Sequence, residues 1–290
     1  MNQVFWNKLQ SIDARILYLV ALLMISASIL FPRLTLPIVP GAQSLFAYNA
    51  VEKAAKGDGS HFFLIDGWWS ASTQGENAPQ SKAIITHLMR LHVPFGILSF
   101  DPQNAQLMAN ITDSLAPQYG YVYGRDYVNF GYQVAPAQTF KGIVSNLKGT
   151  LKSDWKDQPL DKMPVLAKVN SVKDIGAIVD ITPVSSLEYL LGLVVQKYHT
   201  PLIYVPTAVM APEGYPYRDS GQVAGIVVGV KGAGDYESLL HVKGQGTQIC
   251  TALSLVYALI IVLVIVGNIG YHGARRAAAR ETDRAGGQPR

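Results

Sequence analysis

The chain has 290 residues, of which 49% are hydrophobic and only 15% are charged. Soluble domains carry about 25% charged residues, so this balance favours a membrane protein. The chain has a single cysteine, Cys250, which excludes a fold held together by disulfides within the chain or by a metal bound to several cysteines.

The first apolar segment lies near the N-terminus. Residues 16–31 (ILYLVALLMISASILF) carry no charge and are bracketed by Arg15 and Arg33. A bilayer-spanning helix needs about 20 residues, so we expect a transmembrane helix over 16–33, after a short segment 1–15. A cleavable signal peptide is the alternative, but the following PRLTLPIVPGAQS offers no clear small-residue cleavage site. An uncleaved anchor is therefore the prediction.

Short apolar runs then alternate with helical patterns. HFFLI at 61–65 predicts a strand, and residues 81–91 carry apolar side chains at helical spacing. PFGILSF at 94–100 predicts the second strand and 104–115 the next helix. The aromatic stretch 120–130 is either a third strand or an extended loop.

The alternation continues towards the C-terminus. Apolar residues at helical spacing predict a helix from 140 to 151, and DIGAIV at 174–179 predicts a strand. Ser185-Ser186-Leu187-Glu188 has the pattern of a capping box and predicts the start of a helix. PLIYV at 201–205 predicts the last strand.

Nearly continuous apolar strands alternating with helices are typical of a parallel sheet covered on both faces. We therefore expect an α/β domain over 34–248 with a mostly parallel sheet, as a Rossmann-like or flavodoxin-like three-layer sandwich. Residues 249–269 (ICTALSLVYALIIVLVIVGNI) are uncharged and apolar on every face, which predicts a second transmembrane helix over 249–271. A basic tail, 272–290, follows it.

Charge predicts the orientation of these segments. All of the formal net charge of +4 lies on the two tails, because residues 16–270 hold 17 basic and 17 acidic side chains. Positive residues close to membrane spans stay in the cytoplasm. We therefore expect a two-pass plasma-membrane protein of a cell envelope, with both termini inside and the α/β domain outside. The basic isoelectric point reflects topology, and no nucleic-acid partner is expected.

Three predicted strands are followed by aspartate: Asp66, Asp101 and Asp180. Ligands of open parallel sheets bind beyond the carboxyl ends of the strands, so these residues form the candidate ligand-binding site. If the strands are neighbours, the three carboxylates converge and can hold a polar ligand or a divalent cation. The alternative is that they only cap helices and turns, as Asp101 before Pro102 suggests.

Other patterns of chemistry are missing from the sequence. The six histidines lack metal-ligand spacing, no serine sits in a nucleophile elbow, and no glycine-rich fingerprint follows the first strand. No catalytic residue, cofactor or metal site is therefore predicted. Arg125-Asp126 is an ion pair that lies either near a pocket or, as is commoner, in a structural role. Trp68 and Trp69 either stack on a ligand ring, reach the nearby bilayer surface or, as is commoner, pack inside the domain.

Glycines at 221, 225 and 229 share one face if their segment is helical. The segment is too short to cross a bilayer and too late in the fold to be a phosphate-binding loop. We expect Gly221, Gly225 and Gly229 to let the backbone lie close to the sheet, to a neighbouring helix or to another subunit.

These observations favour an accessory or interaction protein that presents an α/β domain outside the membrane, without an enzymatic reaction. Its partners would be the lipid bilayer, other membrane or envelope proteins and a second copy of the chain. The alternative function is a small-ligand- or metal-binding domain, hydrolytic in one version, with its site at the carboxyl ends of the strands.

Overall fold

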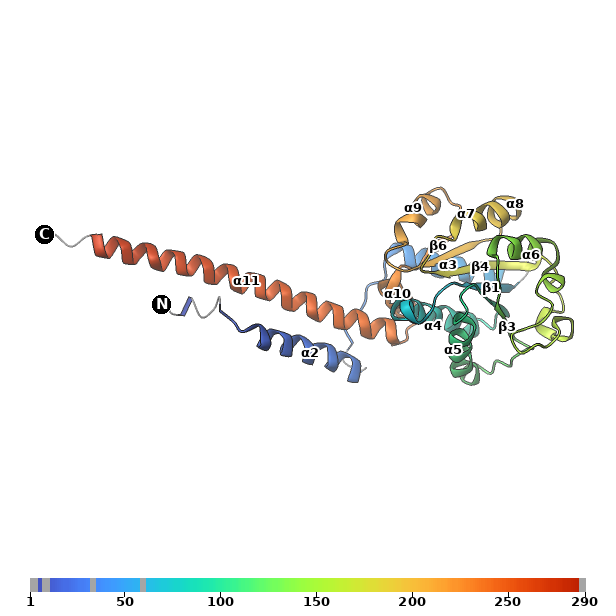
Figure 1. Ribbon diagram of the computed structural model, residues 1–290, viewed down its shortest axis with the longest axis horizontal. Helices are drawn as coiled ribbons and strands as arrows, with labels where there is room; N and C mark the ends of the chain where they lie inside the picture. Colours follow the sequence, from blue (N-terminus) through green and yellow to red (C-terminus); the bar gives the residue numbers. More distant parts are fainter. Residues whose placement is uncertain (1–4, 7–10, 32–34, 58–60, 287–290) are drawn as a thin grey trace. The chain divides into compact units, whose positions relative to one another are not determined.

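A sheet of six strands organises residues Pro37–Thr247, which cluster as one unit of the computed structural model (Figure 1). Every pairing between neighbouring strands is parallel, in the order β3-β2-β1-β4-β5-β6. The predicted α/β class is confirmed, and the strand order is the Rossmann-like one. The strands are β1 (Phe62–Gly67), β2 (Phe95–Ser99), β3 (Tyr127–Tyr132), β4 (Ile175–Thr182), β5 (Leu202–Pro206) and β6 (Gly225–Ile226).

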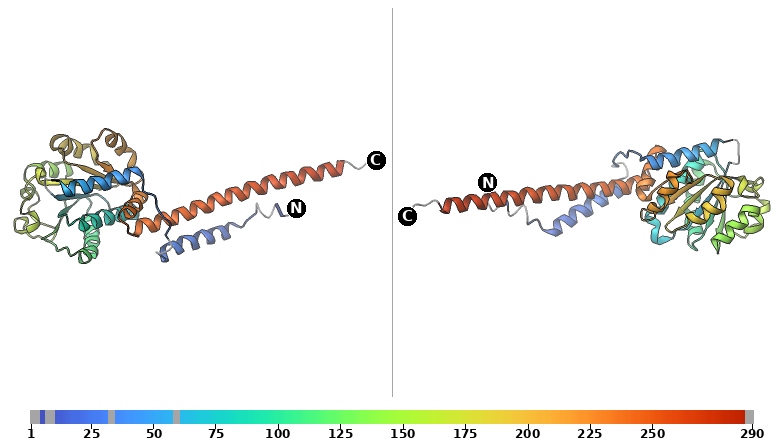
Figure 2. Two further views of the ribbon diagram at one scale, coloured as in Figure 1. Left: turned by 180° about the vertical axis from the view of Figure 1, so that it is seen from behind. Right: turned by 90° about the horizontal axis from the view of Figure 1, so that it is seen from above.

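Helices cover both faces of the sheet (Figure 2). Because both faces are covered, every residue of β1, β2 and β5 is buried, as expected for parallel strands with apolar sequences. One face packs against α3 (Ala42–Lys56), α4 (Gln74–Arg90), α5 (Asn104–Tyr119) and α10 (Gly229–Leu239). The other packs against α6 (Pro136–Leu151), α7 (Leu187–Leu190), the π-helical turn η5 (Leu191–Val195), α8 (Gln196–Tyr198) and α9 (Ala211–Asp219). Short 3-10 turns lie at η1 (Ala71–Thr73), η2 (Leu160–Lys162), η3 (Pro164–Leu166) and η4 (Val172–Asp174).

The structure describes residues 5–6, 11–31, 35–57 and 61–286, with side chains up to residue 279. Residues Met1–Leu36 and Gln248–Arg290 form a second unit. It contains α2 (Ala14–Leu30) and most of α11 (Gln245–Gly286). In the described chain, only α11 is long and apolar enough to cross a membrane, over Gln245–Ala279.

The expected N-terminal span is not supported to the same degree. Helix α2 has 17 residues, fewer than the roughly 20 needed to cross a bilayer. It begins after Asp13, whose carboxylate accepts a hydrogen bond from the backbone N–H of Arg15 at 2.9 Å. The predicted span 16–33 runs past its end, and residues 32–33 lie outside the described residues.

Two predictions about local structure are wrong. The strand at 201–205 is not the last, because β6 follows it and pairs with β5 through two residues. A helix begins at Leu187 as expected, but residues 185–188 form no capping box: the hydroxyl of Ser185 donates to Glu213, and that of Ser186 donates to Asp180 and makes no capping bond. A buried carboxylate acceptor has replaced the helix N–H groups as the partner of Ser186.

The glycine segment is not helical throughout. Gly221 lies in a turn at φ +79°, Gly225 begins β6 and Gly229 begins α10 at φ +52°. The close approach expected of these glycines occurs at Gly225, where an added Cβ would lie 2.3 Å from the Cα of Ala47 in α3. It also occurs at Gly229, where an added Cβ would lie 2.5 Å from Glu76 Oε2 and 3.3 Å from the backbone nitrogen of Ala208. At Gly221 an added Cβ would meet nothing within 4 Å, so that glycine serves the turn.

Helix α10 secures both ends of the α/β unit. The buried carboxylate of Asp235 accepts hydrogen bonds from the backbone N–H of Gly41 and the hydroxyl of Ser44, at the start of α3. Two residues later, the carboxylate of Glu237 accepts from the N–H and the hydroxyl of Thr247, both at 2.7 Å. Since the first N–H groups of a helix have no partner within it, these carboxylates cap the first turns of α3 and α11.

The approach of Gly225 to α3 predicts the effect of substitution. Gly225→Ala should lower the midpoint of thermal unfolding of the full chain in detergent, because its Cβ meets backbone atoms and overpacking costs about 1–3 kcal/mol. Gly75→Ala in the first turn of α4 is the matched control, since its Cβ meets nothing within 4 Å. It should stabilise by up to about 1 kcal/mol. Equal midpoints for the two variants would contradict the close packing.

Candidate functional site

Two of the three predicted aspartates lie side by side at the centre of the sheet. Asp66 in β1 is the register partner of Asp180 in β4, and both side chains are 0% exposed. They share a face with Leu64 and Ile178, two residues earlier on the same strands. The chain order reverses between β1 and β4, and ligands of open α/β sheets bind at this switch point.

Each of these carboxyl groups has one oxygen in use and one without a partner. Asp66 Oδ2 accepts a hydrogen bond from the indole N–H of Trp68 at 3.1 Å. Asp180 Oδ2 accepts one from the hydroxyl of Ser186 at 2.5 Å. Within the described chain, the Oδ1 atoms of both residues are buried and make no hydrogen bond. Buried polar atoms in folded proteins nearly always have partners, so this pair needs an explanation.

The other buried carboxylates of the described chain show the usual pattern. Three more are buried, those of Asp154, Asp235 and Glu237. Each uses both of its oxygens. Asp154 accepts hydrogen bonds from the hydroxyl of Tyr123 and two backbone N–H groups. Asp235 accepts from Gly41, Ser44 and Lys231, and Glu237 accepts from Gly246 and Thr247. Full pairing is what a structural role requires. Asp66 and Asp180 therefore differ from the structural carboxylates of the same domain.

Burial and mutual repulsion hold protons on the pair. Burial, and then the adjacent charge of Asp180, raise the pKa of Asp66 well above its usual value. Burial raises the pKa of Asp180 to about 7; the hydrogen bond from Ser186 lowers it, and the charge of Glu213 adds a smaller upward contribution. Two carboxyls this close cannot both ionise at low cost. The pair therefore carries at least one proton near neutral pH.

Asp101, the third predicted site residue, plays a different part. It follows β2, which neighbours β1, but its Oδ1 accepts a hydrogen bond from the backbone N–H of Gln103 at the start of α5. That is the capping alternative. In the described part of the chain, no three His, Cys, Asp or Glu side chains gather closely enough to hold a metal ion. Ligand binding by Asp66 and Asp180 stays a prediction.

Four aromatic side chains that the sequence analysis did not group together pack on one another beside the pair: Trp68 bonds Asp66, and Tyr189 responds to both aspartate charges. Trp68 contacts Phe100 and Tyr189, with ring centroids 4.7 and 5.9 Å apart. Phe140 contacts the same two rings, each at 5.8 Å. The hydroxyl of Tyr189 is buried without a partner among the described residues, and burial followed by the two aspartate charges raises its pKa. We call Trp68, Phe100, Phe140 and Tyr189 the aromatic cluster.

The sequence held only part of this signal. Trp68 was a candidate for stacking because it follows the first strand, and its neighbour Trp69 is a fully buried core residue. Phe100 and Phe140 read as ordinary strand and helix positions, since nothing local shows that α6 crosses the end of β2. Tyr189 lies three residues after Ser186, so the segment that satisfies Asp180 also places the phenol.

A second buried polar cluster serves as a structural comparison. His87 in α4 bonds Tyr236 of α10 at 2.8 Å and Glu52 of α3 at 3.2 Å, and Tyr48 stacks on its ring at 4.4 Å. None of these side chains has a buried polar atom without a partner. Burial lowers the pKa of His87, so the neutral ring joins three helices. This network explains itself by packing.

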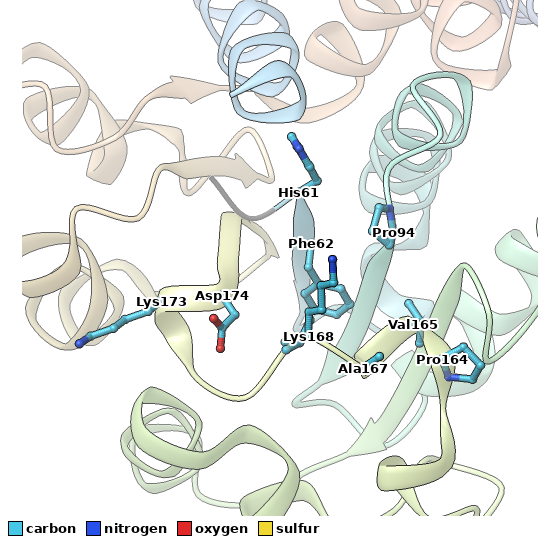
Figure 3. Close-up of a pocket in the computed structure, with 10 residues that line it drawn as sticks. His61, Phe62, Pro94, Pro164, Val165, Ala167, Lys168, Lys173 and Asp174 are labelled. Carbon is cyan, nitrogen blue, oxygen red and sulfur yellow. The ribbon is translucent and has the colours of Figure 1, made fainter. Parts of the chain in front are cut away.

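Two cavities lie away from the carboxyl pair. One of about 530 Å³ opens at the amino ends of β1, β2 and β4, with Phe62 on its floor and Lys168 beside it (Figure 3). The other, about 360 Å³, lies near the end of the edge strand β3, beside Tyr132 and Trp155. Neither is lined by Asp66 or Asp180, and the first lies at the amino ends of the strands, opposite the carboxyl ends where the pair lies.

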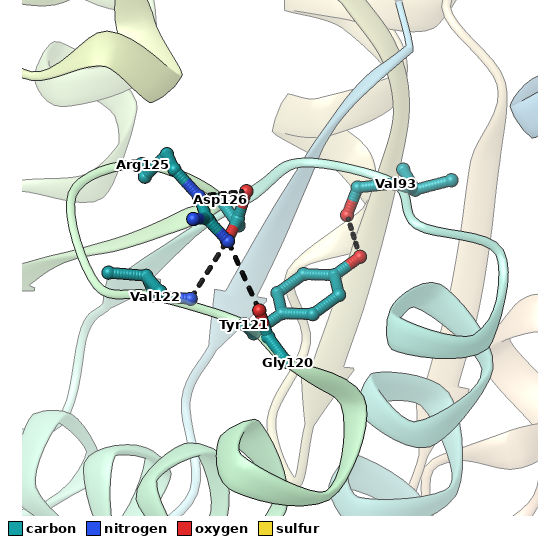
Figure 4. A network of polar contacts seen from close by, with 6 residues as sticks. All are labelled: Val93, Gly120, Tyr121, Val122, Arg125 and Asp126. Atoms are coloured by element: carbon teal, nitrogen blue, oxygen red, sulfur yellow. Dashed lines mark hydrogen bonds and ion pairs between the residues drawn. The ribbon is translucent and has the colours of Figure 1, made fainter.

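Arg125 and Asp126 close a turn. Figure 4 shows the guanidinium of Arg125 against the carboxylate of Asp126, with a further hydrogen bond to the carbonyl of Gly120 at 3.1 Å. Asp126 also accepts from the N–H of Val122, and the hydroxyl of Tyr121 donates to the carbonyl of Val93 at 3.0 Å. These contacts fix the connection between α5 and β3, which is a structural role.

Comparisons of the chain with protein-family models, with curated proteins and with solved structures find no match. The chemistry of the site is therefore argued from its own geometry.

The raised pKa values predict a pH dependence of stability. The folded state holds protons that the unfolded chain loses above about pH 4, so stability falls as pH rises towards about 7, the pKa of folded Asp180. Asp180→Asn removes this titration and keeps an acceptor for Ser186. Its unfolding midpoint relative to wild type should therefore increase from pH 4 to pH 7 and then level off.

Asp219→Asn, in the last turn of α9, shows what the loss of one surface carboxylate does, and the two profiles are compared in chemical denaturation series. A difference between Asp180→Asn and wild type that stays constant from pH 4 to pH 7 would contradict the proton held by the pair.

Proposed function

We propose that this chain is a membrane-tethered domain that binds a small polar ligand through Asp66 and Asp180, at the carboxyl ends of β1 and β4. One observation carries the proposal. Among the five buried carboxylates of the described chain, only these two leave an oxygen without a partner, and they are register neighbours. Leaving a buried polar atom unpaired costs about 1–3 kcal/mol, which a ligand donor group would recover.

The chemistry of the pair defines what the ligand must offer. A carboxyl that holds a proton donates one hydrogen bond and accepts others, while an ionised one only accepts. Together they suit a group that donates hydrogen bonds, such as a hydroxyl or an amine. Neighbouring carboxyls of which one holds a proton are found in acid–base pairs of hydrolases, and hydrolysis remains the catalytic version of this proposal.

Access to the pair runs through the aromatic cluster. Both carboxyl groups are fully covered, whereas Trp68, Phe100 and Tyr189 are only partly buried. The N–H of Trp68 is held by Asp66 through a single hydrogen bond, so rotation of this side chain uncovers the carboxylate.

Thermal unfolding of the full chain in detergent tests the proposal. A panel of polyols, sugars, amines, amino acids and divalent cations should contain a class that raises the midpoint. At 100 times its Kd a ligand adds about 2.7 kcal/mol, or roughly 5–10 °C for a domain of this size. The shift should disappear in Asp66→Asn and Asp180→Asn and persist in Asp101→Asn. A panel without any shift that depends on the pair would overturn the proposal.

An accessory role at the membrane is the second candidate function. Loops that follow β3, β4 and β5 carry exposed apolar side chains: Val134 is 69% exposed, Val184 42% and Val209 85%. All three follow the carboxyl ends of their strands, the same end of the sheet at which Asp66 and Asp180 lie. Apolar side chains grouped at one edge favour contact with another protein, from the envelope or a second copy of the chain. We further propose a two-pass arrangement with both termini in the cytoplasm and the α/β unit outside.

Both parts of this second proposal can be measured. Protease added to intact cells or spheroplasts should cut within residues 37–247 and spare the tails, because the tails carry the net positive charge. Partners retained in mild detergent should be lost in Val209→Asp and kept in Val122→Asp, a variant in the α5–β3 connection. Cleavage of the tails with the domain protected would reverse the topology, and retention in both variants would exclude the loop edge as the contact.

A further inference from the structure

The strongest unexplained feature of the molecule is a buried acidic pair without a basic partner. In the described part of the chain, neither Asp66 nor Asp180 has an ion pair or a hydrogen bond with a lysine, arginine or histidine. The charged groups that influence them are each other and Glu213, which are all acidic. A buried acidic site surrounded by further acidic groups attracts a cation.

The surroundings of the pair match one kind of cation. A divalent metal ion takes six or more oxygen ligands, whereas this site offers two carboxyl groups and one phenol, and the other neighbours are aromatic. The four rings come from four separate elements: Trp68 from the loop after β1, Phe100 from the loop after β2, Phe140 from α6 and Tyr189 from α7. Each ring contacts two others at centroid distances of 4.7–5.9 Å, so the contacts form a closed circuit.

Ring faces and carboxylates together are the chemistry that recognises an organic ammonium ion. A cation within about 6 Å of a ring centroid is attracted by the ring quadrupole, and cages of several aromatic side chains bind quaternary ammonium groups in this way. Trp68 joins the two parts of the site, because its indole belongs to the aromatic cluster and its N–H donates a hydrogen bond to Asp66 at 3.1 Å. Tyr189 joins them from the other side, since its buried hydroxyl responds to the charges of both aspartates.

We propose that the ligand of this site is a small organic cation, an alkylated ammonium, which enters between the rings of Trp68 and Tyr189 and has Asp66 and Asp180 as counterions. This inference rests on the proposed function and specifies its ligand class. It also accounts for the proton on the pair: a bound cation stabilises the ionised carboxylates, so the proton leaves when the ligand arrives.

Calorimetric titration of the full chain in detergent with choline tests this inference. The matched ligand is the neutral isostere of choline, in which a tert-butyl group replaces the trimethylammonium group. Choline should bind at least tenfold more tightly, because only charge distinguishes the two molecules. Titrations at pH 7 in buffers of different ionisation enthalpy should show release of a proton on binding.

Variants separate the aromatic and the acidic contributions. Trp68→Leu should weaken choline binding at least tenfold, while Trp68→Phe, which keeps a ring and loses the N–H, should weaken it less. Trp155→Leu is the control, because that tryptophan lies in another loop, near the end of β3. Asp66→Asn and Asp180→Asn should each weaken binding at least tenfold, with folding checked by the midpoint of thermal unfolding.

The outcomes distinguish the two levels of the argument. Equal affinity for choline and its neutral isostere, or no binding of choline by a folded wild-type chain, overturns the ammonium inference. If a neutral polyol or a divalent cation then shifts the unfolding midpoint in a manner that depends on the aspartates, the proposed ligand-binding function stands with a different ligand class. If no member of the panel does so, both are wrong.

Discussion

The pairing of β1 with β4 is the constraint on which the site depends. These two strands lie at the centre of a parallel sheet, and their register places Asp66 directly opposite Asp180. A slip of one residue would turn one carboxyl to the other face of the sheet. The apolar residues before each aspartate prevent that slip, because Leu64 and Ile178 belong to one core and Ile65 and Val179 to the other. Packing therefore forces two acidic groups together in a place that water does not reach.

The domain tolerates this arrangement because its stability comes from elsewhere. Two separate apolar cores, one on each face of the sheet, bury most of the large side chains. The ends of the α/β unit are fixed independently by α10, whose Asp235 and Glu237 cap the first turns of α3 and α11. Neither of these contacts involves the carboxyl pair, so changes at the pair leave them in place.

Sequence patterns predicted the parts of this fold that local periodicity encodes. The parallel sheet, most of its strands and the helices α4 to α6 follow from apolar spacing, and the aspartates at the strand ends follow from the rule for open α/β sheets. Strand β6 was missed because two residues are too few to form a pattern. The glycine segment was misread because its glycines serve three different elements, a turn, a strand and a helix start.

The candidate site shows the same boundary between local and tertiary information. The two aspartates could be named from the sequence, but their separation from Asp101 depends on where α5 begins. Residues 185–188 were assigned to a capping box, since the sequence cannot show that a buried carboxylate lies within reach of the hydroxyl of Ser186. The aromatic cluster depends entirely on tertiary structure, because its four side chains come from elements spread over more than 120 residues. Contacts between distant elements bring these aromatic side chains together, and no local spacing reports them.

The use of aspartate at both positions is itself an argument for a ligand. An asparagine at 66 or 180 could accept the hydrogen bond from Trp68 or Ser186 equally well, and it would bring no charge into the core. Burial is the main cause of the raised pKa values, and a single such replacement would remove one of the two buried ionisable groups, so stability alone favours the amide. What two carboxyl groups provide, and one carboxyl with one amide does not, is a second negative charge or a proton that can be released. A bound partner that carries positive charge or exchanges a proton would make use of either.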